Sequence, residues 1–245
     1  MIIPDWSAPA RVHAVSTTRV GGQSLSPYDS LNLAQHVDDN KEAVRANRAI
    51  LKRLAGYGGE PAWLEQVHGN TVINAAQAEA IVKADASFTT MTNTTCVVMT
   101  ADCLPVLFCD KQGKGVAAAH AGWRGLAEGV LESTLKRLCS ELACSSSDVM
   151  AWMGPAIGPT AFEVGNEVRE AFISQHDVAS VFSETRPQHW LMDIYAVARE
   201  RLKAAGVNEI SGGQFCTYSD EEHFFSYRRD GQCGRMASLI WLQDE

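Results

Sequence analysis

Two histidines and one cysteine have the types and surroundings expected of side chains that share a chemical task. They are His68 in QVHGN, Cys103 in TADCLP and His120 in AAAHAGWRG, each beside small residues and near the expected end of a strand. A strand end holds a side chain rigidly, and a neighbouring glycine lets a second backbone or a substrate approach. Two imidazoles and a thiolate could bind zinc and leave the fourth position to water, which is typical of a catalytic site. Zinc lowers the pKa of such a water towards about 7.

The same residues allow two other interpretations. Cys103 and His120 could form a nucleophile–base dyad, in which Asp102 would orient the site or act as an acid. Alternatively, Cys103 is a core residue and the histidines are satisfied by hydrogen bonds, since unpaired cysteine is among the most buried residue types. Because spacing does not establish that the three side chains converge, all three interpretations stay open at this point.

The elements that must position these residues mix strands and helices. Strands are expected at 95–100 and 104–109, on both sides of Cys103, and the turn residues at 110–113 predict a hairpin from 104–109 to 115–119. The other expected strands cover 11–17, 62–67, 71–74, 149–153 and 236–242. The expected helices begin near a capping box at 39–42 and end at Gly56, cover 124–142 and 165–175, and run from Asp193 to Gly206.

Strands joined by hairpins, with helices that do not alternate strictly with them, indicate an α+β fold of mixed β-sheets flanked by helices. No repeat or linker is visible, so residues 1–245 are interpreted as a single catalytic domain. With 46% hydrophobic residues, a chain of this length can bury a sizeable core.

The charge balance and the cysteines exclude several classes of protein. With 21 Lys and Arg against 29 Asp and Glu, the net charge of −8 argues against a nucleic-acid partner. The most apolar window, 96–109, is too short to span a bilayer and contains Asp102, so no membrane partner is expected. The N-terminal residues do not resemble a signal peptide. Seven cysteines without a CxxC pair favour reduced thiols, and hence a cytoplasmic protein.

Four sequence blocks carry a resemblance to a known family. TADCLPVLF, HAGWRG, GPAIGP with the following FEVG, and FFSYRRDGQCGR are similar to the YfiH family over roughly residues 12–242. That family is also called the multicopper polyphenol oxidase or laccase-like family, and it includes the bacterial peptidoglycan editing factors. The resemblance implies that His68, Cys103 and His120 are zinc ligands.

The resemblance also implies an activity. It points to a zinc-dependent purine nucleoside phosphorylase that acts on adenosine, inosine and methylthioadenosine, with adenosine deaminase activity. The alternative is an amidohydrolase that removes a wrong amino acid from a UDP-muramyl precursor. A third hypothesis is a binding protein without catalysis. Either enzyme would act on a small molecule, as a monomer or a homodimer.

The residue counts bear on the copper and deaminase activities. The chain has seven histidines and no His-x-His pair, which suffices for one three-ligand site but not for a multicopper set. Oxidase activity is therefore expected to be secondary. The HxE and PCxxC pattern of nucleobase deaminases is absent. Asp102 is the candidate carboxylate for such chemistry, although neighbours on a strand face opposite ways.

Phosphorolysis also needs an anion site, for which arginine is well suited. The candidate substrate-binding residues are Arg48, Arg124, Arg228 and Asn32. Arg124 lies at an expected helix start, where the helix dipole favours anions. The structural alternatives are a solvated helix face for Arg48, a first-turn residue for Arg124 and a charged turn for Arg228. Asn32 could bind a sugar hydroxyl or cap a helix.

Overall fold

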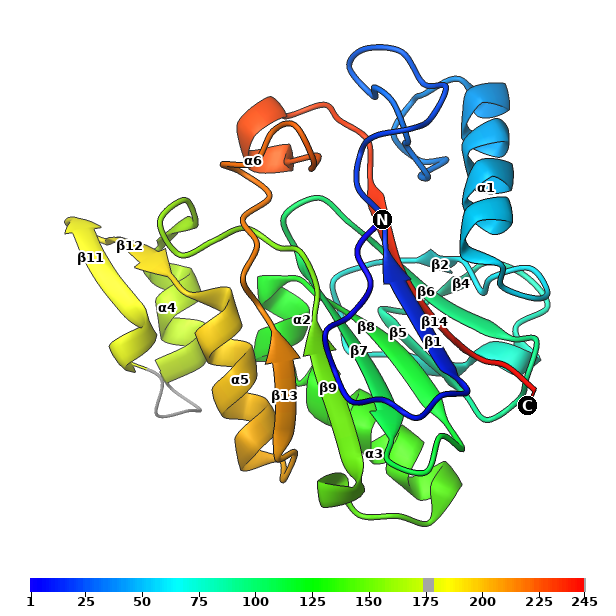
Figure 1. Cartoon of the computed structure of the whole chain (residues 1–245). Helices are drawn as coiled ribbons and strands as arrows, with labels where there is room; N and C mark the ends of the chain where they lie inside the picture. Colours follow the sequence, from blue (N-terminus) through cyan, green and yellow to red (C-terminus); the bar gives the residue numbers. More distant parts are fainter. Residues whose placement is uncertain (174–178, 245) are drawn as a thin grey trace.

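The computed structural model describes residues 1–173 and 179–244 and is built around two packed β-sheets (Figure 1). The larger sheet has six strands in the order β13-β9-β7-β8-β5-β3. These strands are β3 Val72–Asn74, β5 Ala86–Thr89, β7 Leu104–Asp110, β8 Val116–Ala121, β9 Val149–Met153 and β13 Glu209–Gly212. The outer pairs, β13 with β9 and β3 with β5, are parallel, and the inner pairs are antiparallel.

The second sheet is antiparallel, with β14 between β1 and β6. Its strands are β1 Val12–Ser16, β6 Thr95–Thr100 and β14 Met236–Leu242. A smaller sheet, at the far left of Figure 1, contains β10 Glu163–Gly165, β11 Phe182–Arg186 and β12 His189–Met192. A short parallel pair, β2 Leu64–Glu65 with β4 Val82–Lys83, completes the strands of the described residues.

The two central strands, β7 and β8, are buried at every position. Successive side chains point to opposite faces of a sheet. Val106 and Phe108 accordingly join the core on the helical side, whereas Leu107 and Cys109 join the core between the two sheets. Because both faces are covered, an apolar residue is needed at nearly every position, which explains the apolar run that the sequence shows at 96–109.

Helices cover the outer faces of both sheets. Helix α3 (Val130–Leu142) packs with α5 (Ile194–Ala204) on the larger sheet, and α1 (Lys41–Ala55) packs on the three-stranded sheet (Figure 1). The remaining helices are α2 Trp123–Ala127, α4 Asn166–Ile173 and α6 Tyr227–Asp230, with single 3-10 turns η1 Ala75–Gln77, η2 Ser146–Asp148 and η3 Ala179–Val181. No helix in residues 1–173 and 179–244 is long and apolar enough to cross a membrane.

The predicted α+β class is confirmed, as are the β7–β8 hairpin and the helix ends at Gly56 and Gly206. The single helix predicted over 124–142 is wrong. Gly129 adopts a left-handed φ of +87°, which interrupts the helical conformation between α2 and α3. The cap of α1 is Asn40, whose side chain accepts hydrogen bonds from the backbone N–H of Glu42 and Ala43.

The bounds of other predicted elements also change. The strand expected at 62–67 is reduced to Leu64–Glu65, and the one expected at 71–74 becomes Val72–Asn74. The helix expected at 165–175 is α4, Asn166–Ile173, and its last two predicted positions lie outside the described residues. The shortened strand β2 leaves residues 66–71 free to form the turn that carries His68.

Candidate metal centre

His68, Cys103 and His120 come together although 52 residues of sequence separate the first from the last. One ligand atom from each lies within 4.8 Å of the other two. The Sγ of Cys103 is 3.8 Å from Nε2 of His68, and the two imidazole rings meet edge to face with centroids 4.8 Å apart. The convergence that spacing left open is therefore present in the structure.

Each ligand is held by a different part of the fold. His120 lies within β8, one residue before its end, and Cys103 directly precedes β7. His68 does not end a strand: it lies in the turn after β2, with a left-handed φ of +62°. His120 is buried, Cys103 is half-buried and His68 is exposed. The group thus reaches from the core to the surface, where a substrate can approach it.

Asp85 is the residue that links two of the ligands, and no sequence motif points to it. Its side chain is fully buried just before β5. Oδ1 accepts hydrogen bonds from Nδ1 of His120 at 2.8 Å and from the backbone N–H of His68 at 2.9 Å, and Oδ2 accepts from the N–H of Gly69 at 2.8 Å. With Nδ1 engaged, Nε2 of His120 is the nitrogen available to a metal ion.

The charges of this group favour the ligand form of the cysteine. Burial raises the pKa of Cys103, but His120 and His68 outweigh it and bring the pKa down to about 6. Burial lowers the pKa of His120, but the Cys103 thiolate and the hydrogen bond to Asp85 raise it to about 9. Cys103 is therefore a thiolate at neutral pH, and a metal ion that binds would displace the imidazolium proton.

The two glycines of HAGWRG make room for this arrangement. A Cβ on Gly122 would lie 2.6 Å from Cδ2 of His68 and 3.2 Å from Sγ of Cys103. A Cβ on Gly125 would lie 2.6 Å from the carbonyl oxygen of Gly69. The turn that carries His68 can therefore pack against α2 only because both positions lack a side chain. The space, together with one sulfur and two nitrogen donors, fits a zinc ion.

Gly122→Ala is expected to lower the metal content of the purified protein. The added methyl group must displace His68, and a shift of a ligand or of its support typically costs about 10–100-fold in metal affinity. Gly69→Ala is the matched control, because its Cβ would meet no atom closer than 3.7 Å although it adjoins the same ligand. Metal analysis of both variants decides the matter, and equal metal content would contradict this account of Gly122.

A cavity of about 410 Å³ opens onto the three ligands. Its other lining residues are His36, Gln66, Met99, Thr100, Ala101, Tyr227 and Arg235. None of these seven residues has a role that the sequence alone predicts. A signal was present for three of them, because Tyr227 and Arg235 belong to the SYRRDGQCGR block and Gln66 begins the QVHGN motif.

None of the four predicted substrate-binding residues is among those that line this cavity. Arg48 donates from Nε to the carbonyl of Leu33 and stacks on Trp63, 3.6 Å from the ring centroid. Burial lowers the pKa of Arg48 to about 10. Arg124 is exposed and lies over the ring of Trp123, its neighbour in α2.

Arg228 and Asn32 bind other parts of the chain. Nη1 of Arg228 donates to the carbonyl of Glu163 at 2.8 Å. Asn32 is fully buried and its Oδ1 accepts from the backbone N–H groups of Ala34, at 3.0 Å, and Arg235, at 2.9 Å. The amide of Asn32 therefore connects its loop to a residue of the cavity wall.

Asp102 connects the bend between β6 and β7 to Thr217 and to helix α6. Its Oδ1 accepts from the hydroxyl of Thr217 at 2.7 Å, and its Oδ2 accepts from the backbone N–H of Arg228 at 2.7 Å. Asp102 has a left-handed φ of +91°, at the bend between β6 and β7. Both carboxylate oxygens thus have protein donors, and Asp102 is not a member of the three-ligand group.

Comparison with known proteins supports the same assignment of family. The model of the family described as multi-copper polyphenol oxidoreductase laccase matches residues 13–243. Purine nucleoside phosphorylase PA4543 of Pseudomonas aeruginosa is 53% identical, covering 99% of this chain and 98% of the relative. Purine nucleoside phosphorylase YfiH of Escherichia coli K12 is 52% identical, with the same two shares covered.

A solved structure has the same fold. The crystal structure of Neisseria meningitidis protein NMB0706 superposes with a TM-score of 0.95, at 49% identity and over 99% of both chains. The resemblance to YfiH proteins that the four sequence blocks carry is thereby confirmed. The chain belongs to the multi-copper polyphenol oxidoreductase laccase family.

Proposed function

We propose that this protein is a purine nucleoside phosphorylase whose activity depends on one zinc ion held by His68, Cys103 and His120. The observation that carries the proposal is the His-Cys-His group that lines an open cavity. The names of relatives that are 53% and 52% identical over 98% of their length support the same reaction. Adenosine, inosine and methylthioadenosine are the proposed substrates, and deamination of adenosine is a side activity to be tested with them.

The two imidazoles and the thiolate favour one zinc ion over a set of copper ions, although the family is described as multi-copper. Among the residues that the structure describes, one group of three His, Cys or carboxylate side chains could hold a metal. A sulfur and two imidazoles suit zinc, with a position left for a ligand. When bound, zinc supplies a Lewis acid that stabilises negative charge as it develops.

The chain's own residues prepare the site in three ways. Asp85 orients His120 and fixes the turn of His68 through backbone hydrogen bonds. Gln66 fixes the cavity wall, since its amide both donates to and accepts from the backbone of Met99. Tyr227 is 61% exposed at the cavity rim, where its ring is available to stack on a purine base.

Phosphate dependence is the experiment that tests the proposed reaction. A phosphate oxygen should attack C1′ of the ribose as the bond from C1′ to N9 breaks, which yields ribose 1-phosphate and the free base in equal amounts. Purified protein is incubated with inosine or adenosine, with and without inorganic phosphate, and both products are measured. Base release that is equally fast without phosphate, or that yields free ribose, would contradict phosphorolysis.

The editing activity is a second candidate because the cavity is not isolated. An adjoining hollow of about 430 Å³ shares His36, Tyr227 and Arg235 with it, so an elongated ligand could occupy both. Release of serine from a UDP-muramyl precursor, faster than nucleoside turnover in the same preparation, would favour this amidohydrolase function.

All seven cysteines are free thiols, which supports the proposal that the protein works in the cytoplasm.

A further inference from the structure

Arg235 is the one arginine among the residues that line the cavity above the metal ligands. Its guanidinium is half-buried and lies 5.7 Å from the ring centroid of Tyr227. Nη1 donates to the carbonyl oxygens of Cys233 at 2.8 Å and Gly234 at 3.0 Å. Within residues 1–173 and 179–244, neither Nε nor Nη2 has a hydrogen-bond partner, and no carboxylate forms an ion pair with this arginine. The guanidinium nitrogens Nε and Nη2 therefore remain available to donate hydrogen bonds to a ligand.

The backbone of Arg235 is held on both sides. Its N–H donates to the buried Oδ1 of Asn32 at 2.9 Å, and its carbonyl accepts from the N–H of Leu33. The preceding carbonyls of Cys233 and Gly234 hold the guanidinium at the end of the side chain through Nη1. Because the side chain is already ordered before a ligand arrives, binding costs less conformational entropy.

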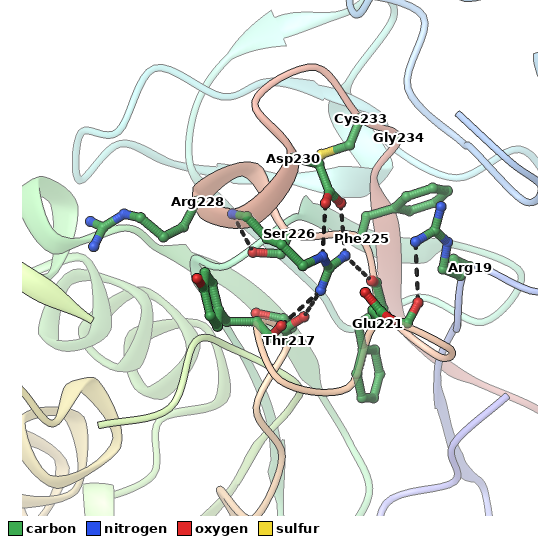
Figure 2. Close-up of polar contacts among 12 residues, drawn as sticks. Arg19, Thr217, Glu221, Phe225, Ser226, Arg228, Asp230, Cys233 and Gly234 are labelled. Carbon is green, nitrogen blue, oxygen red and sulfur yellow. Dashed lines mark hydrogen bonds and ion pairs between the residues drawn. The ribbon is translucent and has the colours of Figure 1, made fainter. Parts of the chain in front are cut away.

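The loop that leads to Arg235 is fixed as well. The guanidinium of Arg229 donates to the carbonyls of Thr217 and Phe224, each at 2.9 Å, and pairs with Asp230 at 2.7 Å. Figure 2 shows this cluster of bonds between Thr217 and Asp230, with Cys233 and Gly234 beyond it. These hydrogen bonds and this ion pair hold the segment that carries Tyr227 and Arg235, two residues of the cavity wall.

The cavity is locally positive in a protein of net charge −8. No aspartate or glutamate is among its lining residues. Partial burial lowers the pKa of His36, and the positive charges of Arg235 and Arg48 lower it further. Both arginines therefore project positive potential onto this wall. A cavity with cationic groups and no carboxylate attracts anions even when the whole protein is acidic.

We propose that Arg235 binds the oxyanion that reacts above the metal site, which is inorganic phosphate in the reaction proposed above. The planar guanidinium can present Nε and Nη2 side by side to two phosphate oxygens, the arrangement that arginine forms with tetrahedral anions. This inference rests on the proposed function for the identity of the anion. It assigns to Arg235 the role of anion binding for which the sequence offers Arg48, Arg124 and Arg228 as candidates.

Arg235→Gln tests this assignment in the full-length, metal-loaded protein. Since charge-assisted hydrogen bonds are lost, the KM for phosphate should rise about 10-fold or more, while the KM for inosine changes little. Arg235→Lys keeps the positive charge but loses the paired donors of the guanidinium. Its KM for phosphate should therefore lie between those of the wild type and Arg235→Gln. Arg53→Gln, an exposed arginine at the end of α1, is the control for charge removal and should match the wild type.

A second measurement does not depend on catalysis. Inorganic phosphate should raise the thermal unfolding midpoint of the wild type and of Arg53→Gln, and should do so much less for Arg235→Gln. An unchanged phosphate KM and an unchanged phosphate-induced shift in Arg235→Gln would overturn the proposal. Should Arg235→Gln not fold, Arg235→Lys decides by the same two measurements. If phosphate stabilises only chains with Arg235 but no nucleoside is cleaved, the anion site stands and the phosphorylase proposal fails.

Discussion

Replacing Cys103 by alanine is expected to abolish both metal retention and phosphate-dependent nucleoside cleavage. Cys103 supplies the one sulfur of the three-ligand group, and its low pKa makes it a thiolate at neutral pH. Loss of an outer-shell partner already costs about 10–100-fold in metal affinity, so loss of a charged ligand should cost more. Metal analysis of the purified variant and an assay of ribose 1-phosphate formation measure the two effects.

The control for this variant is Cys144→Ala. Cys144 is also partly buried, but it packs against the core beside α3 and is not among the residues that line the metal cavity. This variant should keep its metal and its activity. If Cys103→Ala cleaved inosine at the wild-type rate, a role for the thiolate as ligand or nucleophile would be untenable.

The second large effect is expected for Asp85→Asn. The asparagine keeps the size of the side chain but removes the negative charge and one of its acceptor oxygens. His120 then loses the partner that fixes its Nδ1–H, and the turn of His68 loses one of its backbone bonds. The affinity for zinc should fall about 10–100-fold. Competition with a chelator of known affinity measures this change directly.

Asp110→Asn is a closely matched control. Asp110 is also a buried aspartate that accepts hydrogen bonds from three backbone N–H groups, those of Gln112, Lys114 and Gly115. These groups belong to the turn between β7 and β8, and no metal ligand contacts this carboxylate. Both variants should lose stability, but only Asp85→Asn should lose metal affinity. Equal zinc affinities in the two would contradict the role given to Asp85.

Much of the site could be predicted because its signals are local in sequence. His68, Cys103 and His120 each lie in a short motif with small neighbours, and the strands beside Cys103 are marked by unbroken apolar runs. These features follow from burial on both faces of a sheet, which leaves a clear pattern in the sequence.

The residues that support the site could not be predicted in this way. Asp85 lies between two alanines, and its importance comes from a hydrogen bond to a residue 35 positions away. Arg235 lines the cavity, and its backbone is held there by a hydrogen bond to Asn32, 203 positions earlier in the sequence. Arg48 and Arg228 looked equally suitable, but their guanidinium groups bind backbone carbonyls elsewhere. Tertiary contacts of this kind leave no periodic pattern.

The central claim is that His68, Cys103 and His120 hold one zinc ion on which phosphorolysis depends. The most direct measurement is a zinc titration of metal-free protein, with inosine cleavage followed in the presence of phosphate. Activity should rise in proportion to added zinc and reach its plateau at one ion per chain, and Cys103→Ala should stay inactive throughout. Full activity of the metal-free chain, or a plateau that requires several copper ions, would contradict the claim.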